Sequence, residues 1–252
     1  MKSLFRRILP ILALAVQTLL FTPDAPGADP ARQGALAGSG STGAPRPAQE
    51  AAFARDPELD GILERMETVY HGIRTFQARF DQETETKSLR RTRRSSGWIY
   101  VEKPDKIRWS YEAPEPQEVY VLGDRVFLWI PARNQVLKSS EADMPGMAQI
   151  RVLLAQGRLS ESFTITLLPP PADSEGFHCL RLVPTETAKL SLEEMILFVR
   201  KEDSLLERTE SRDLVGNVTR IRFHDWRVNG DLSPDLFRFE IPQGAEVLEG
   251  AF

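Results

Sequence analysis

The feature that most constrains the fold is an apolar period of two that begins near residue 75 and recurs along the rest of the chain. In its first stretch Phe76, Ala78 and Phe80 alternate with polar residues. Residues that alternate in this way point to opposite faces of a β-strand. Turn signals such as Pro104-Asp105 and Gly123-Asp124 separate the stretches. Short neighbouring strands joined by tight turns predict an antiparallel meander.

The alternation predicts about eleven or twelve strands. After the first, they are expected at residues 97–102, 106–112, 118–122, 125–130, 135–138, 162–168, 177–183, 194–201, 205–213, 217–228 and 236–240. Residues 144–159 interrupt the series and are predicted to form one or two short helices. The expected fold is therefore α+β and mostly antiparallel β, with one large curved sheet and helices packed on one face.

One longer helix is predicted before the first strand. Asp56 supplies an N-cap and Pro57 a first-turn proline. Apolar residues then recur three or four positions apart over residues 59–73, which is the spacing of one helix face.

The N-terminus has the pattern of an export signal. Residues 1–7 are basic, residues 8–21 are mostly apolar, and Ala25-Pro-Gly-Ala28 supplies small residues for cleavage. The apolar run is shorter than the roughly 20 residues of a membrane span, so a cleaved signal is favoured over a membrane anchor. We assign residues 1–28 to a signal peptide, 29–55 to a flexible linker rich in Pro, Gly and Ala, and 56–252 to one domain. The simplest compartment is the periplasm.

Charge and cysteine content exclude several function classes. Without residues 1–28 the chain loses three basic residues and one acidic residue, so its formal net charge falls from −4 to −6. An acidic protein is a poor candidate for nucleic-acid binding. The single cysteine, Cys179, has no disulfide partner in the chain, and no cysteine follows the apolar run as a lipid attachment site. No nucleophile motif, paired carboxylates or metal-ligand spacing is visible, so we expect neither an enzyme nor a cofactor.

Aromatic residues occupy many positions that the alternation assigns to the inner side of the sheet. They are Trp98, Trp109, Tyr111, Phe127, Trp129, Phe223, Phe237 and Phe239. Two interpretations fit them: an ordinary core, or an apolar cavity between the sheet and the helices. Periodicity does not separate these, because both require apolar residues that face inward.

Five stretches of the chain, taken together and in order, resemble one known family. They are Ile73–Gln82, Gly97–Tyr111, Val121–Pro131, Asp213–Phe223 and Leu236–Val247. The second has a glycine, an apolar strand, a basic residue with a proline, and then a strand in which a basic residue precedes Trp. The chain resembles the LolA family of periplasmic lipoprotein carriers. The resemblance implies an incomplete β-barrel closed by the N-terminal helix and a short helical lid.

The resemblance also implies a function. The protein would hold the acyl chains of lipoproteins in a hydrophobic cavity, as a chaperone that shuttles them from the inner to the outer membrane. Its partners would be an inner-membrane ABC transporter that releases lipoproteins and, where one is used, an outer-membrane acceptor lipoprotein. We expect a monomer. The residues expected to line the cavity are Met66, Tyr70, Ile73, Tyr100, Ile107, Trp109, Tyr111, Phe127, Trp129, Val152, Leu153 and Leu154. Two alternatives stay open: a shuttle for another lipid or glycolipid, and a periplasmic sensor module of the same fold.

Two basic features carry more specific expectations. In the family a basic residue before the strand-breaking proline, usually arginine, holds the lid and first helix shut, and here that residue is Lys103. Its expected partners are carbonyl groups near Tyr70 and residues 153–155; the alternative is a solvated lysine beside a turn. Arg90, Arg91, Arg93 and Arg94 are expected at a hairpin tip. They would form a docking surface for anionic lipid head groups or the loading transporter, or simply a solvated tip.

Overall fold

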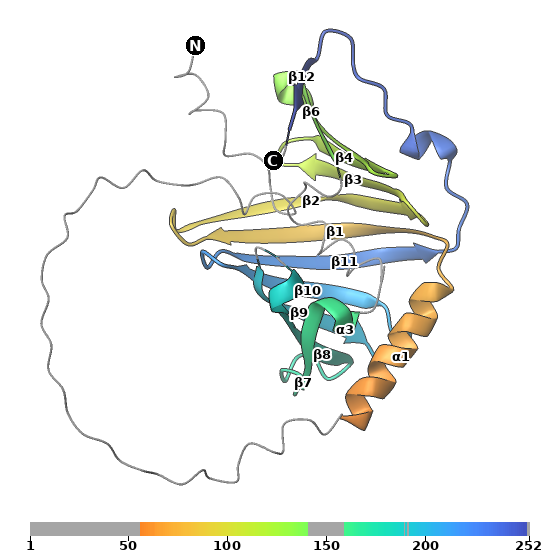
Figure 1. Cartoon of the computed structure of the whole chain (residues 1–252), viewed down its shortest axis with the longest axis vertical. Coiled ribbons are helices and arrows are strands. Elements are labelled where there is room, and N and C mark those ends of the chain that lie inside the picture. The colour runs from red at the N-terminus through yellow and green to blue at the C-terminus, as the bar shows by residue number, and fades with distance from the viewer. Residues whose placement is uncertain (1–55, 141–158, 189, 191, 251–252) are drawn as a thin grey trace, which may run out of the picture.

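The computed structural model describes residues 56–140, 159–188, 190 and 192–250, which build one sheet with a helix at its N-terminal end (Figure 1). The helices are α1 (Pro57–His71), α3 (Leu159–Ser162) and the short 3-10 helices η2 (Pro131–Arg133), η4 (Glu186–Ala188) and η5 (Pro234–Phe237). The strands are β1 (Thr75–Thr86), β2 (Arg91–Glu102), β3 (Lys106–Ala113), β4 (Gln117–Leu122), β5 (Arg125–Ile130), β6 (Gln135–Ser140), β7 (Phe163–Leu168), β8 (Phe177–Pro184), β9 (Leu192–Arg200), β10 (Leu206–Asp213), β11 (Val218–Val228) and β12 (Glu246–Glu249).

The helix α1 begins where the sequence predicts. The Asp56 side chain accepts a hydrogen bond from the Glu58 backbone N–H at 3.0 Å, and Pro57 is the first helical residue. This side-chain bond satisfies one of the backbone donors that a helix start leaves open. Ile62, Met66 and Tyr70 are buried on one face of α1, and their spacing of four residues is that of a single helical stripe.

All twelve strands belong to one sheet, in the order β12-β6-β5-β4-β3-β2-β1-β11-β10-β9-β8-β7. The strands from β1 to β6 form one meander and those from β7 to β11 form another. The antiparallel pair of β1 and β11 joins the two meanders. The prediction of a mostly antiparallel sheet is confirmed, and β12 beside β6 is a parallel pair.

The C-terminal end departs from the prediction. A strand was expected at residues 236–240, but residues 234–237 form η5 and the last strand is β12. The Ser233 hydroxyl accepts a hydrogen bond from the Asp235 N–H, and Pro234 opens the helix. This capped proline turn outweighs the alternation of Phe237 and Phe239.

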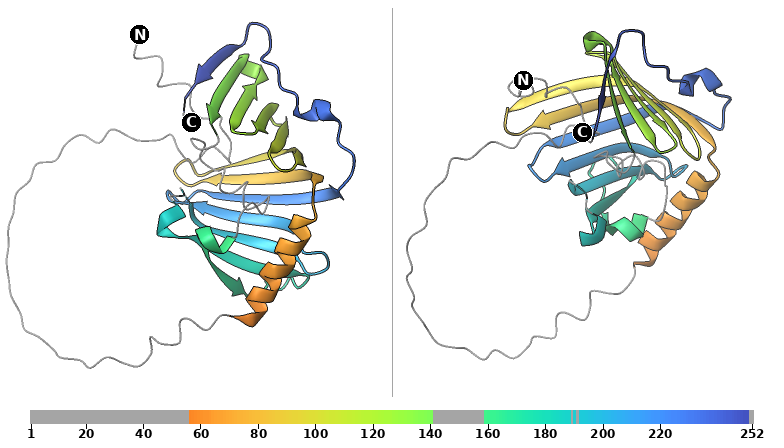
Figure 2. Two further views of the ribbon diagram at one scale, coloured as in Figure 1. Left: turned by 45° about the vertical axis from the view of Figure 1, so that its right-hand side comes forward. Right: turned by 45° about the horizontal axis from the view of Figure 1, so that its top comes forward.

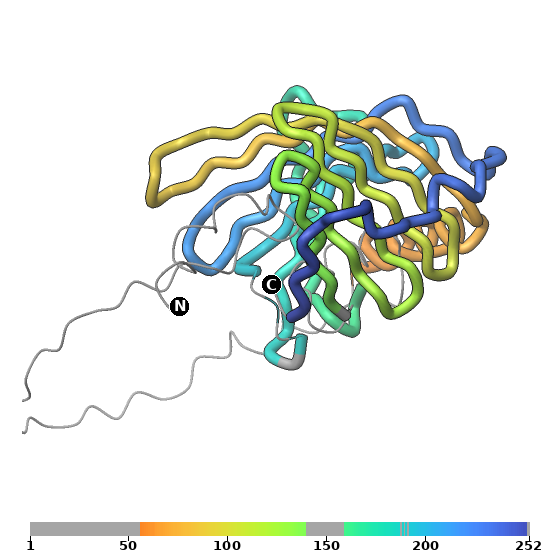
Figure 3. Tube along the Cα trace, turned by 90° about the horizontal axis from the view of Figure 1, so that it is seen from above, coloured from red at the N-terminus to blue at the C-terminus, as the bar shows by residue number. Residues whose placement is uncertain are grey.

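The sheet is curved but not closed, which confirms the incomplete barrel (Figures 2 and 3). Its two edge strands, β12 and β7, are not paired with each other in the described part of the chain. We call the face that carries the main buried cluster, together with α1, the inner face, and the opposite face the outer face. The predicted helical lid falls mostly on residues 141–158, outside the described residues, as do the predicted signal peptide and most of the linker.

Candidate functional site

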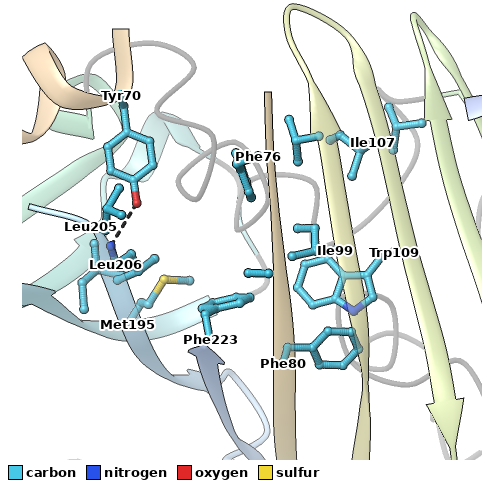
Figure 4. Packing of buried hydrophobic residues seen from close by; sticks show 14 of the residues in the cluster. Tyr70, Phe76, Phe80, Ile99, Ile107, Trp109, Met195, Leu205, Leu206 and Phe223 are labelled. Carbon is cyan, nitrogen blue, oxygen red and sulfur yellow. Dashed lines mark hydrogen bonds between the residues drawn. The ribbon is translucent and has the colours of Figure 1, made fainter. Parts of the chain in front are cut away.

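The inner face is one continuous apolar surface. Side chains from α1 and from the strands β1–β5 and β7–β11 meet there in a single buried cluster. In Figure 4, Tyr70, Met195, Leu205 and Leu206 lie on one side, Ile99, Ile107 and Trp109 lie on the other, and Phe76 and Phe223 lie between them. Residues from the two meanders and from α1 therefore share one apolar interior.

Aromatic rings form the centre of this surface. The Phe80 ring centroid lies 5.0 Å from that of Trp109 and 5.1 Å from that of Tyr111. The Phe223 ring lies 6.2 Å from Trp109. These separations are in the range of favourable aromatic pairs, so the group is a packed platform on β1, β3 and β11.

Gly97 of β2 lies between two of these aromatic residues in the sheet register, opposite Phe80 on β1 and Tyr111 on β3. The β2–β3 register shifts between Ser96 and Gly97. A Cβ atom on Gly97 would lie 1.9 Å from the Ser110 carbonyl oxygen. A glycine inside a strand commonly marks such a close backbone approach, and this signal was present in the sequence.

The inner face becomes polar toward the turn between β1 and β2. Buried polar residues there are Gln82, Thr84, Ser95, Thr209, Ser211 and Thr219. The Tyr111 hydroxyl donates a hydrogen bond to Gln82 Oε1 at 3.3 Å. Burial raises the pKa of Tyr111 well above its ordinary value, and the bond to Gln82 acts in the opposite sense. Among the described residues, Gln82 Nε2 at this end and Trp109 Nε1 nearer the centre of the inner face have no hydrogen-bond partner, so both side chains offer N–H donors there.

Six residues predicted to line a cavity lie in the inner-face cluster: Met66, Tyr70, Ile73, Ile107, Trp109 and Tyr111. Three others do not, and the prediction that they face inward is wrong. Phe127 and Trp129 belong to a separate cluster on the outer face. Tyr100 alternates with the inner-face residues Ile99 and Val101 and also faces outward. Val152, Leu153 and Leu154 lie outside the described residues.

The outer-face cluster is covered by the segment that follows β11. Its buried members are Tyr120, Phe127 and Val136, and Phe239 packs on them. The Phe239 ring lies 4.8 Å from Tyr120 and 5.0 Å from Phe127. In Figures 1 and 3 the dark blue C-terminal segment runs along the outside of β3–β6 before it reaches β6. Both faces of β4 and β5 are therefore buried, each against a different part of the chain.

Lys103 contacts the first helix, as expected. Its Nζ donates a hydrogen bond of 2.6 Å to the Tyr70 carbonyl oxygen, in the last turn of α1. The Lys103 backbone N–H donates to the Arg74 carbonyl oxygen at 2.8 Å. Burial lowers the pKa of Lys103 below its ordinary value. The other expected partners, residues 153–155, lie outside the described residues.

Tyr70 ties α1 to the opposite meander, a contact that the sequence analysis did not foresee. Its hydroxyl oxygen accepts a hydrogen bond from the Leu206 backbone N–H at 3.0 Å (Figure 4). Burial raises the pKa of Tyr70 from 10.0 to about 12. The last turn of α1 is thus held on one side by Lys103 and on the other by β10.

The arginine cluster does not lie as a unit at a hairpin tip. Only Arg90 lies in the turn, and β2 already begins at Arg91. The β1–β2 ladder continues to Thr86 opposite Arg91, so the strand is six residues longer at this end than predicted. Arg94 pairs with Glu83 at 2.9 Å and Arg93 with Glu115 at 3.8 Å. Neither arginine lies in the turn. Arg94 shares the outer face with Glu83, whereas Arg93, its neighbour in β2, lies opposite Thr84 on the inner side.

Within the described ranges, none of the helices combines the length and the apolar character needed to cross a membrane.

Residues 71–240 match the sequence model of the family described as outer membrane lipoprotein carrier protein LolA. An outer-membrane lipoprotein carrier protein from Alkalilimnicola ehrlichii is 33% identical over 181 residues, which span 71% of this chain and 80% of that protein. A protein of the same description from Chromohalobacter salexigens is 30% identical over 203 residues, covering 75% of this chain and 87% of that protein. The names of these relatives describe carriers, not enzymes.

A solved structure supports the fold. The crystal structure of an uncharacterized conserved protein from Thermus thermophilus superposes with a TM-score of 0.51 at 16% sequence identity. The match covers 77% of this chain and 99% of that one. At this level of identity the likeness concerns the fold alone.

Proposed function

Because this chain belongs to the LolA family of outer membrane lipoprotein carriers, we propose that its inner face binds lipoprotein acyl chains and shuttles them through the periplasm. The observation that supports this most is the inner-face cluster itself. One apolar surface extends across β1–β5 and β7–β11, and α1 packs on it as a separate element. Such a surface suits a ligand made of several hydrocarbon chains.

The energetics of the task fit such a surface. Apolar area removed from water contributes about 25 cal/mol per Å², so exposed acyl chains are costly in the periplasm. A carrier that releases its cargo without ATP needs a moderate net affinity. If α1 and the inner face pack against each other in the unloaded protein, cargo must displace these contacts, and the net affinity falls by the free energy of closure.

We assign the role of latch to Lys103. Its bond to the Tyr70 carbonyl oxygen joins the turn between β2 and β3 to the end of α1. Lysine keeps the positive charge of the arginine usual in the family but makes fewer directed bonds than a guanidinium group. The Tyr70–Leu206 bond supplies a second attachment of the same helical turn.

The remaining parts of the proposal follow from the family. The protein acts in the periplasm as a non-enzymatic monomer. It receives lipoproteins from an inner-membrane ABC transporter and passes them to an outer-membrane acceptor. The arginines at positions 90, 91, 93 and 94 form part of the surface that docks on the transporter.

Site-specific photo-crosslinking tests the cargo site. Ile107 is buried on the inner face, and Arg108 next to it points outward and pairs with Glu118 at 2.8 Å. A crosslinker at Ile107 is expected to capture lipoprotein in cells, and one at Arg108 is expected to capture little. Equal capture at both positions would count against an inner-face site. Native mass spectrometry of the periplasmic protein would identify the carried lipid as added mass.

A further inference from the structure

Two hairpin turns carry the most exposed large apolar side chains in the described part of the chain. Leu89, in the turn between β1 and β2, is 69% exposed. Leu214 and Val215, in the turn between β10 and β11, are 68% and 67% exposed. Exposed apolar side chains scattered singly need no explanation, but a group of them does.

The two turns are neighbours. The ladder between β1 and β11 ends with Glu85 opposite Val218. Glu85 is the second-last residue of β1, and Val218 is the first residue of β11, so both turns begin at this end of the ladder. The Lys87 backbone N–H donates a hydrogen bond to Asn217 Oδ1 at 3.0 Å, which joins the turns directly. Figures 2 and 3 show both turns projecting from the same side of the molecule. We call Leu89, Leu214 and Val215 the hairpin tip.

The turn that presents Leu214 and Val215 is held by its own polar groups. Asp213 Oδ1 accepts hydrogen bonds from the backbone N–H groups of Val215 at 3.0 Å and Asn217 at 2.8 Å. Asn217 Nδ2 donates to Asp213 Oδ2 at 2.7 Å. Gly216 supplies the positive φ of 85° that the turn requires. Since these polar groups are satisfied within the turn, the apolar side chains are presented in a fixed arrangement, and little ordering entropy is lost when they bind.

Basic residues flank the hairpin tip. Lys87, Arg90 and Arg91 lie in or next to the first turn and are exposed. The nearest acidic residues of β1 are already paired: Glu83 with Arg94, and Glu85 with Arg220 at 2.6 Å. Asp213 at the second turn adds one negative charge against the three positive charges of Lys87, Arg90 and Arg91. The local charge is therefore positive although the chain as a whole is acidic.

We propose that the hairpin tip inserts into the surface of a lipid bilayer that carries anionic head groups. Apolar side chains at the boundary of head groups and acyl chains, with lysine and arginine beside anionic lipids, are the composition of interfacial membrane contacts. This inference goes beyond the proposed carrier function, because the contact needs neither cargo nor a partner protein. It places the domain on the membrane with the inner face's polar end toward the lipid.

Vesicle partitioning tests the proposal. The protein is exported, purified from the periplasm and mixed with vesicles of phosphatidylcholine alone or with about one-third phosphatidylglycerol. The variants are L89S/L214S/V215S, K87Q/R90Q/R91Q and, as a matched control, I241S. Ile241 is 48% exposed but lies in the segment between η5 and β12, outside both turns.

The wild-type protein and I241S are expected to bind the anionic vesicles equally. The triple serine variant is expected to bind at least about tenfold more weakly, since burial of even one large apolar side chain is worth about that factor. The triple glutamine variant should lose the preference for anionic vesicles. Unchanged melting temperatures confirm that all variants fold.

Absence of vesicle binding by the wild type, or equal binding by the triple serine variant, overturns the proposal. If the tip variants impair only transfer from membranes that contain the loading transporter, the tip binds a protein and the lipid contact is wrong. Cargo capture at Ile107 does not depend on any of these outcomes, so the carrier function is tested separately.

Discussion

At the scale of single residues, a close backbone contact requires glycine at position 97. Because an added Cβ would lie 1.9 Å from the Ser110 carbonyl oxygen, Gly97→Ala must displace β3 or the aromatic platform on it. Overpacking of this kind costs about 2–3 kcal/mol, which lowers Tm by about 5–10 °C in a domain of this size. Gly176→Ala is the matched control, since nothing lies within 4 Å of its Cβ position. Thermal unfolding of both variants measures the difference; equal Tm values would show that Gly97 is not constrained.

Tyr70 makes the stability of the folded protein depend on pH in the alkaline range. Burial raises its pKa from 10.0 to about 12, so the folded state holds the proton more tightly than the unfolded state. The resulting stabilisation is complete below pH 10 and is lost as the pH rises toward 12. The raised pKa of Tyr111 likewise lowers the stability of the folded state as the pH rises. The lowered pKa of Lys103 has the opposite effect, because the folded state then gains stability as the lysine loses its proton.

Tyr70→Phe isolates this contribution. The variant leaves the buried Leu206 N–H without its acceptor, which costs about 1–3 kcal/mol at neutral pH. Denaturant unfolding is expected to show that the difference between wild type and variant shrinks between pH 10 and 12. A difference that stays constant over this range would mean that Tyr70 titrates normally in the folded state.

At the scale of elements, Lys103 connects the turn after β2 to the end of α1. Lys103→Leu removes the bond to the Tyr70 carbonyl oxygen and so favours the arrangement in which α1 leaves the inner face. If α1 competes with cargo, the variant is expected to retain lipoprotein several-fold longer than wild type. Transfer to acceptor membranes measures retention.

Lys106→Leu is the control for this variant. Lys106 follows the same turn, but its Nζ bonds Glu102 at 2.7 Å rather than the helix, so its transfer rate should match wild type. Lys103→Arg is expected to restore release, because arginine can donate to the same carbonyl oxygen. A wild-type transfer rate for Lys103→Leu would leave Lys103 as a structural contact only.

The sequence predicts most strands but not every face of them. Strands with one apolar face were predicted well, because a period of two assigns each side chain to a face. The assignment failed for Phe127 and Trp129, because residues 126–130 are apolar on both faces. The outer face of β5 is buried because Phe239, more than a hundred residues later in the chain, packs against it. The parallel partner of β6 was missed for the same reason: β12 is short and mostly exposed, and its pairing is non-local.

At the scale of the whole molecule, apolar and charged surfaces are separated by the sheet. The inner face is apolar, while much of the outer face carries paired charges, such as Arg220 with Glu210 at 2.9 Å and Arg181 with Glu194 at 2.7 Å. Exposed pairs of this kind contribute little to stability. The sequence predicted the apolar interior and the family, but not which arginines are neutralised, because that depends on neighbours across strands.

This pairing separates the four clustered arginines into two sets, and their effects on loading should differ. Arg93 and Arg94 have carboxylate partners, whereas Arg90 and Arg91 lie at the turn in an otherwise acidic protein. Uncompensated charge accelerates association and is screened within about 8 Å at physiological salt. R90Q/R91Q is therefore expected to slow loading from inner-membrane vesicles by about threefold or more at low ionic strength and to have little effect near 1 M salt. R93Q/R94Q, with the same change in formal charge, should slow loading less. Release of lipoprotein into the soluble fraction measures the rate, and equal slowing by both variants would mean that net charge, rather than the turn, directs docking.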